Sequence, residues 1–171
     1  AGAAIVNDVT AFRHDPALAD EAARAGAGVV LMHSRGPLLE IASYHHADYD
    51  GDVVGAVLHE LSDAIGQATR RGVSPDAIVV DPGLGFSKTP EQNKLVCDRL
   101  GALLSLGRPI LVGPSRKRFV GTMIDLDASD RDRATAIVCA LAWERGARLF
   151  RVHDVAATRE ALAVARAIGG P

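Results

Sequence analysis

Short apolar runs alternate with longer amphipathic stretches along the whole chain, and the alternation repeats five times. The apolar runs lack polar residues at alternate positions, as in Ile78, Val79 and Val80, which is typical of strands covered on both faces. The stretches between them are rich in Ala, Leu, Glu and Arg, which is typical of surface helices. The pattern therefore predicts five βα units. The expected strands are residues 4–6, 29–32, 77–80, 109–112 and 148–152.

Capping and turn residues mark the ends of the predicted helices. Asp15 and Thr89 each precede a proline, so we expect them to be N-caps with proline at the first helical position. Four helices are followed by a glycine, the residue that most often ends a helix in the left-handed conformation: Gly26, Gly72, Gly107 and Gly146. The expected helices are residues 16–25, 51–71, 90–106, 130–145 and 156–168.

Strands that alternate with helices through short connections run parallel, in an open doubly wound sheet or in a closed (β/α) barrel. Hydrogen-bonding side chains follow every predicted strand. A barrel gathers the carboxyl ends of all its strands at one rim, whereas an open sheet has its site at one switch point. The pattern favours the barrel, although an open sheet also has polar loops. The residues are Asn7, Asp8, His33, Arg35, Asp81, 115–118, Arg151, His153 and Asp154.

Length and composition narrow the class of protein. The chain has 171 residues, of which 48% are hydrophobic, so we expect a single domain over residues 1–171. A formal net charge of −2 argues against extended nucleic-acid binding. The sequence has neither the ~20 apolar residues of a membrane helix nor a signal peptide, so we expect a soluble, cytoplasmic protein without membrane contacts. Cys97 and Cys139 lack metal or disulfide spacing and are expected to be reduced thiols.

Asp81 ends a buried strand and opens a glycine-rich turn, which is where we expect a ligand. Pro82 fixes one backbone angle, and Gly83 and Gly85 allow conformations that let the backbone approach a bound molecule. The alternative is a carboxylate that caps the loop. Phe86 lies in the same turn, where its ring edge could contact a flat ligand.

Two cationic segments add candidate anion-binding groups. Arg151 and His153 share one face of the last strand and suit a polyanion; the alternative is an ion pair between Arg151 and a carboxylate such as Asp8. Three consecutive cations follow a glycine turn at residues 116–118, and we expect Lys117 to point inward because it shares parity with Ser115. Lys117 would then neutralise phosphate or hydrogen-bond a heterocycle carbonyl, while a solvated face is the common alternative. The P-loop spacing is absent.

No metal site is predicted. A zinc site needs three or four convergent nitrogen or sulfur ligands. The loop and helix histidines share no such spacing, and we interpret them as surface residues: His14, His45, His46 and His59.

Five motifs occur in a characteristic order: Asn-Asp-Val at 7–9, Val-Leu-Met-His at 30–33, Asp-Pro-Gly-Leu-Gly-Phe-Ser-Lys-Thr at 81–89, Gly-Pro-Ser-Arg-Lys at 113–117 and Arg-Val-His-Asp-Val at 151–155. With them the chain resembles dihydropteroate synthase over almost its whole length. The resemblance implies an α/β fold of the (β/α)8 TIM-barrel family, here a partial barrel of about five βα units that lacks the first three. It also implies condensation of 6-hydroxymethyl-7,8-dihydropterin pyrophosphate with p-aminobenzoate in folate biosynthesis.

The resemblance assigns roles residue by residue. Lys117 and Asp81 are the expected catalytic residues, and both also bind the pterin. Arg151 and His153, with the backbone of Val152, are expected to hold the pyrophosphate. The remaining roles are pterin binding for Asn7, Met32 and Gly113, and the p-aminobenzoate side for Phe86, Ser115 and Arg118.

The reaction that the resemblance implies is dissociative: the C–O bond breaks first, and the aromatic amine then attacks a pterin methylene cation. Mg²⁺ is the expected cofactor, but its family ligand falls in the part that this chain lacks. The resemblance also implies a homodimer and a sulfonamide target.

Two departures from the family pattern affect these expectations. Arg118 stands where the family often has Ser, so the contact to the p-aminobenzoate carboxylate would come from a guanidinium. A barrel needs eight βα units, and the sequence supplies five, so we expect the chain alone to be weakly active or inactive. The alternatives are a pterin-binding, methyltransferase-like protein and a non-catalytic fragment.

Overall fold

The computed structural model describes residues 2–125, 127 and 131–169. All five strands form one parallel sheet whose spatial order follows the chain order. A doubly wound sheet would reverse direction at a switch point, so the order confirms the barrel arrangement. The strands are β1 (Ile5–Asp8), β2 (Gly28–Met32), β3 (Ile78–Asp81), β4 (Ile110–Val112) and β5 (Ala147–Phe150).

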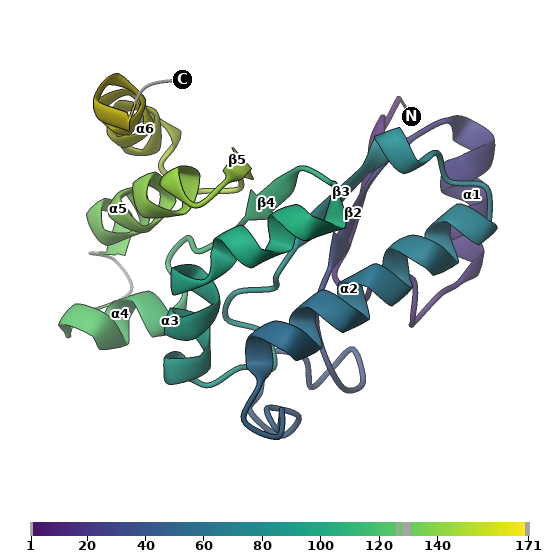
Figure 1. Ribbon diagram of the computed structural model, residues 1–171, viewed down its shortest axis with the longest axis horizontal. Coiled ribbons are helices and arrows are strands. Elements are labelled where there is room, and N and C mark those ends of the chain that lie inside the picture. Colours follow the sequence, from purple (N-terminus) through teal and green to yellow (C-terminus); the bar gives the residue numbers. More distant parts are fainter. Residues whose placement is uncertain (1, 126, 128–130, 170–171) are drawn as a thin grey trace.

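The helices pack on one face of this sheet, and α2 runs across it in Figure 1. Val29, Leu31 and Ile78 contact α1 and α2 in one hydrophobic cluster. Val80 and Ile110 belong to a second cluster with α2, α3 and α5. The helical elements are α1 (Ala17–Ala25), α2 (Val53–Arg70), η1 (Pro75–Ala77), α3 (Pro90–Asp98), η2 (Leu100–Leu106), α4 (Arg118–Ile124), α5 (Arg131–Glu144) and α6 (Val155–Gly169).

Local capping chemistry agrees with most of the predicted ends. Thr89 and Gln92 form a capping box at the start of α3. Gly26 and Gly107 end their helical elements with φ of 61° and 64°, in the left-handed region. Asp15 accepts a hydrogen bond from the N–H of Ala17 at 3.1 Å, but the helix starts one residue later than expected, with Pro16 at the N-cap position.

Several elements differ from the sequence prediction. The helix expected over 90–106 divides into α3 and the 3₁₀ helix η2, because Leu100 and Leu103 are both buried, and a spacing of three matches the turn of a 3₁₀ helix. The short helix α4 was not predicted. The last strand ends at Phe150, two residues early. The expected helix start at residue 130 lies outside the described residues.

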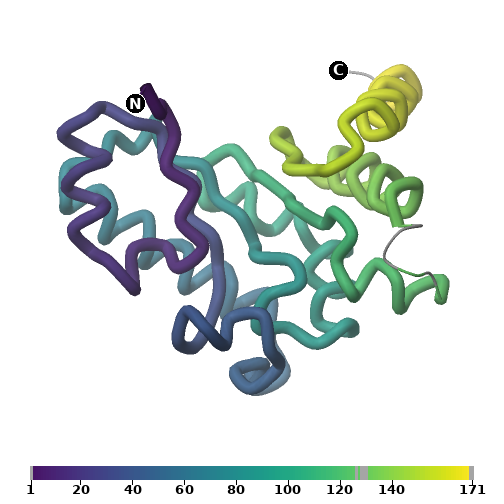
Figure 2. The backbone as a smooth tube through the Cα atoms, turned by 180° about the vertical axis from the view of Figure 1, so that it is seen from behind, coloured from purple at the N-terminus to yellow at the C-terminus, as the bar shows by residue number. Residues whose placement is uncertain are grey.

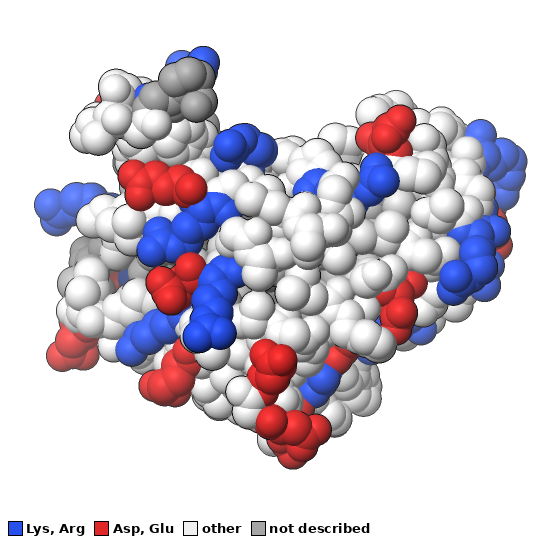
Figure 3. Space-filling view, viewed as in Figure 1, with Lys and Arg blue, Asp and Glu red and all other residues white. Residues whose placement is uncertain are grey.

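The other face of the sheet is concave and open, as seen from behind in Figure 2. A cavity of about 410 Å³ there is lined from all five strands, for example by Asn7, Val30 and Val79. Ile5 is 64% exposed on this face, so none of the described elements covers it. On the opposite side, where the helices lie, charges of both signs are interspersed in Figure 3. No helix in the described ranges is long and apolar enough to cross a membrane.

Candidate functional site

The side chains expected to bind the ligand lie on the concave face. Successive residues of a strand alternate between faces, and the helix-packed residues Leu31 and Val80 fix which face is which. Met32 and Asp81, which are register partners, therefore point to the open side, as Asn7 does. Asn7 and Arg151 line the cavity on this face, Gly113 and Arg151 line the neighbouring cavity, and Met32 also borders the cavity on the helix side of β2.

Asp81 lies at the centre of this rim and is only 6% exposed. Its Oδ1 accepts a hydrogen bond of 2.7 Å from the N–H of Gly83, and its carbonyl accepts one from the N–H of His33. Burial raises the pKa of the Asp81 carboxyl, and the charge of Lys117 and the Gly83 N–H offset part of that rise. Gly83 has φ of 67°, and a Cβ there would lie 1.8 Å from the carbonyl oxygen of His33, so only glycine fits.

Lys117 reaches over the turn that follows Asp81. Its Nζ donates to the carbonyl of Leu84 and lies 4.0 Å from the centroid of the Phe86 ring. Burial lowers the pKa of Lys117 to about 8, and the charge of Asp81 opposes that change while Arg151 adds to it. Lys117 thus joins a carboxylate, a cation and an aromatic ring in one place.

The prediction that Lys117 alone of the three consecutive cations points inward is confirmed, but the parity argument for it was wrong. Arg116 has φ of 57°, so the segment is a turn and not extended. The two neighbours of Lys117 contact other partners. The guanidinium of Arg116 donates to both carboxylate oxygens of Asp132 at 2.9 and 2.8 Å, and Arg118 lies 4.7 Å from the centroid of the exposed Tyr44 ring.

The expected phosphate-binding groups surround a cavity of about 220 Å³ beside Lys117. Arg151 follows the end of β5, where its N–H donates to the carbonyl of Val112. The carboxylate of Asp8 accepts hydrogen bonds from the N–H groups of Thr10 and Phe12, in the loop that follows its own strand. The cavity is lined by Gly113, Ser115, Lys117, Arg151, Val152 and His153.

Ser115 and His153 are linked in both directions. The backbone N–H of His153 donates to the Ser115 Oγ at 3.1 Å, and the same Oγ lies 2.7 Å from the His153 Nδ1. An oxygen that accepts from the backbone can give its own proton to Nδ1, which leaves the Nε2–H of a neutral His153 as a donor. Ser115, which is expected on the p-aminobenzoate side, therefore lies against His153, one of the residues expected to bind pyrophosphate.

Sequence reasoning missed a buried group beneath the site. Lys88 is 0% exposed, and its Nζ lies 2.8 Å from the His33 Nδ1. The other ring nitrogen of His33 lies 3.1 Å from Oε2 of Glu60, whose Oε1 accepts from Arg35. Burial lowers the pKa of Lys88 to about 7 and that of His33 to about 4. Burial alone would raise the pKa of Glu60, but hydrogen bonds from His33 and Arg35 outweigh it and hold that pKa at about 2.

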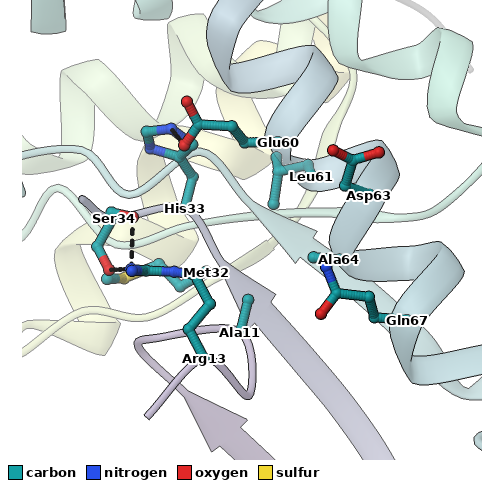
Figure 4. Close-up of a pocket in the computed structure, with 10 residues that line it drawn as sticks. All are labelled: Ala11, Arg13, Met32, His33, Ser34, Glu60, Leu61, Asp63, Ala64 and Gln67. Carbon is teal, nitrogen blue, oxygen red and sulfur yellow. Dashed lines mark hydrogen bonds and ion pairs between the residues drawn. The ribbon is translucent and has the colours of Figure 1, made fainter. Parts of the chain in front are cut away.

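A third cavity, of about 150 Å³, opens on the helix side of β2 (Figure 4). The loop after β1 contributes Arg13, whose guanidinium donates to the carbonyl and hydroxyl of Ser34 at 2.6 and 2.9 Å. Glu60 and Asp63 enter from α2. His33 lines this cavity and also contacts Lys88. It therefore lies between this cavity and the buried lysine beneath the turn that follows Asp81.

Comparison with known proteins gives one family match. A family model described as pterin binding enzyme matches residues 1–153. The dihydropteroate synthase of Mycobacterium leprae is 44% identical over 169 residues, which cover 95% of this chain and 59% of that protein. A Mycobacterium bovis protein named inactive dihydropteroate synthase 2 is 35% identical over 172 residues, with 99% and 54% covered. The chain thus spans a little over half the length of these relatives.

Solved structures agree with the fold. The crystal structure of dihydropteroate synthase from Stenotrophomonas maltophilia with active site-bound imidazole has a TM-score of 0.92 and 38% identity, covering 98% of this chain and 62% of that one. The enzyme from Xanthomonas albilineans in complex with 7,8-dihydropteroate has a TM-score of 0.89 and 37% identity, with 99% and 61% covered. The five units described above therefore superimpose on a part of each larger structure.

Proposed function

Because the chain belongs to the pterin-binding enzyme family, we propose that it supplies five of the eight βα units of a dihydropteroate synthase. The full-length protein would condense 6-hydroxymethyl-7,8-dihydropterin pyrophosphate with p-aminobenzoate, releasing dihydropteroate and pyrophosphate. The observation that carries the proposal is the convergence of Asp81, Lys117 and Arg151 at the carboxyl ends of neighbouring parallel strands. Asp81 and Lys117 suit the pterin ring of the substrate, and Arg151 suits its pyrophosphate.

Asp81 and Lys117 suit the pterin ring. The Asp81 carboxylate accepts hydrogen bonds from an edge of N–H donors, and the Lys117 ammonium donates to the ring carbonyl. Lys117 already donates to the carbonyl of Leu84, so the ligand carbonyl would share or replace that acceptor. Asn7 and Met32 lie on the same concave face, where they would complete the pocket. Gly113 lies directly beside Arg151, since a Cβ there would be in ordinary contact with the Arg151 carbonyl oxygen at 3.7 Å.

Arg151 and His153 suit the pyrophosphate. The guanidinium fork and the Nε2–H left free by Ser115 are donors that would stabilise the charge that develops as the C–O bond breaks. The backbone of Val152 lies between them. The electron pair of the broken bond stays on the pyrophosphate, and the amine of p-aminobenzoate then attacks the pterin methylene cation and loses a proton. No serine or cysteine nucleophile is needed.

Phe86 and Arg118 suit the aromatic acid. The Phe86 ring lies under the Lys117 ammonium at the site edge, where it would flank p-aminobenzoate. Arg118 is exposed beside Tyr44 and would pair with the carboxylate in place of a serine hydroxyl. The described residues include no group of three or more His, Cys, Asp or Glu side chains that could bind a metal ion. The resemblance assigns the Mg²⁺ ligand to a part of the family outside this chain, so no step of this proposal depends on Mg²⁺.

The test is formation of dihydropteroate from labelled p-aminobenzoate and the pterin pyrophosphate in the presence of magnesium. We expect turnover by the full-length protein and little or none by the 171-residue chain, because five strands leave the pocket without its opposite wall. Binding of the pterin pyrophosphate without product would instead support a pterin-binding protein, like the relative named inactive. Normal turnover by the 171-residue chain would contradict the incomplete site.

We also propose a cytoplasmic homodimer. Exposed apolar side chains on α5 and α6 support a surface for self-association: Ile137 is 60% exposed, Val164 59% and Ile168 80%. The mass of the full-length protein in solution, measured by light scattering, tests the oligomeric state, and a monomer at micromolar concentration would contradict it.

A further inference from the structure

Lys88 is the largest of the fully buried side chains described. Burying an ammonium is costly unless every proton finds an acceptor. Here the Nζ has three acceptors: the His33 Nδ1 at 2.8 Å, the Phe86 carbonyl at 3.2 Å and the Gly83 carbonyl at 3.3 Å. None of the three is a carboxylate. Lys88 therefore does not form an ion pair through these contacts; its ammonium donates to two backbone carbonyls and one imidazole nitrogen.

Those two carbonyls belong to the turn that shapes the site. The N–H of Phe86 also donates to the Gly83 carbonyl, so Lys88 binds both ends of one hydrogen-bonded turn. The Gly83 N–H holds the Asp81 carboxylate, and the Phe86 ring lies beneath Lys117. The positions of a carboxylate and an aromatic ring in the site thus depend on the shape of a turn that Lys88 holds from below.

A second set of contacts holds Lys88 itself. An ammonium that donates to the His33 Nδ1 requires the proton of a neutral His33 to be on Nε2, which faces Glu60 at 3.1 Å. Arg35 donates to the same carboxylate. The row of ammonium, imidazole and carboxylate therefore runs from the turn to α2. Figure 4 shows its last two members, His33 and Glu60, at the wall of the cavity on the helix side of β2.

We propose that Lys88 is a positioning residue for the synthase reaction, holding the turn from Asp81 to Phe86 in its working shape and supplying a buried positive charge beside the Asp81 carboxylate. His33 and Glu60 keep its ammonium in place. The proposal rests on the proposed function, because Asp81 must bind the pterin for its position to affect turnover.

The electrostatic part of the proposal has a definite sign. Burial raises the pKa of Asp81, and Lys88 is one of the cations that oppose this rise, with Lys117 and Arg151. Glu60 and Arg35 also act on Lys88, with opposite signs. Removing the Lys88 charge takes away one opposing cation, so the pKa of Asp81 rises further. An ionised Asp81 accepts pterin N–H groups more strongly than a protonated one, so the acid limb of kcat/KM for the pterin pyrophosphate should move to higher pH.

The experiment compares Lys88→Met with Lys94→Met in the full-length enzyme. Lys94 is exposed on α3, so its variant makes the same chemical change away from the site. We expect Lys88→Met to lower kcat/KM by about 10- to 100-fold and to move the acid limb upward by about one pH unit. Lys94→Met should match the wild type. A folded Lys88→Met enzyme with an unshifted acid limb overturns the proposal.

A second variant covers the case in which Lys88→Met does not fold. Glu60→Gln changes a partly exposed residue, keeps an acceptor for the His33 Nε2–H and removes the charge that favours protonated Lys88. We expect a smaller upward shift of the same limb, and no shift overturns the proposal. If the wild-type enzyme makes no dihydropteroate, the proposed function fails before Lys88 is tested, so the two failures are distinct.

Discussion

Replacing Lys117 with alanine should weaken binding of the pterin pyrophosphate by about 10- to 100-fold. Lys117 presents its ammonium over the Phe86 ring, on the same rim as Asp81. A charge-assisted hydrogen bond contributes about 1.5–3 kcal/mol when its partner is otherwise left buried. At about 1.4 kcal/mol for each factor of ten, this corresponds to the expected loss.

The pH dependence of binding gives this prediction a second measurement. Burial lowers the pKa of Lys117 to about 8, so its ammonium is mostly charged at pH 7 and loses its proton as the pH rises through 8. The affinity of the wild type should therefore fall above pH 8. The Lys117→Ala variant has no ammonium to lose, and its affinity should be flatter over the same range.

Isothermal titration calorimetry of the full-length protein measures both effects. Lys94→Ala is the matched control, since it removes an exposed lysine on α3. Thermal unfolding of each variant shows whether the fold survives, because the contact of Lys117 with Phe86 contributes about 0.5–1 kcal/mol by itself. An unchanged dissociation constant in a folded Lys117→Ala protein at pH 7 would show that Lys117 does not bind the pterin.

Two further substitutions follow from the same geometry. Gly83→Ala should lower the melting temperature by about 4–8 °C, because a Cβ at φ of 67° meets the His33 carbonyl at 1.8 Å and costs about 2 kcal/mol. Gly101→Ala is the control, since its Cβ would lie 3.6 Å from its nearest neighbour. Equal melting temperatures of the two variants would refute the clash. Arg118→Ala should raise KM for p-aminobenzoate several-fold and leave KM for the pterin pyrophosphate unchanged. The control Tyr44→Phe keeps the ring and should behave as the wild type. Equal effects of Arg118→Ala on both KM values would contradict the role of Arg118.

The sequence by itself determined the five strands and their order along the chain. Ile78, Val79 and Val80 form a run that only a buried strand explains, and the two-residue period then places Asp81 on the face opposite the one that Val80 packs. The capping box at Thr89 is equally local, since its two partners are three residues apart. Such features depend on neighbouring residues, so a single sequence is enough to predict them.

Only the tertiary structure decided where the cations of the site lie and what holds them. In sequence, Lys88 is a charged residue in a glycine-rich turn, which is typical of an exposed loop. Its burial depends on His33, 55 positions earlier, and on Glu60 from α2. Lys117 likewise points inward because Asp132 holds Arg116 elsewhere, 16 positions along the chain.

The physical reason is that a local pattern records which face a residue prefers, but not which distant groups satisfy its charge. The free energy of burying an ammonium depends on acceptors that folding brings together. The turn after Asp81 could be recognised as a site from its glycines, because their backbone freedom is a local property. That a buried lysine holds the turn in place became visible only once β2, β3 and α2 were assembled.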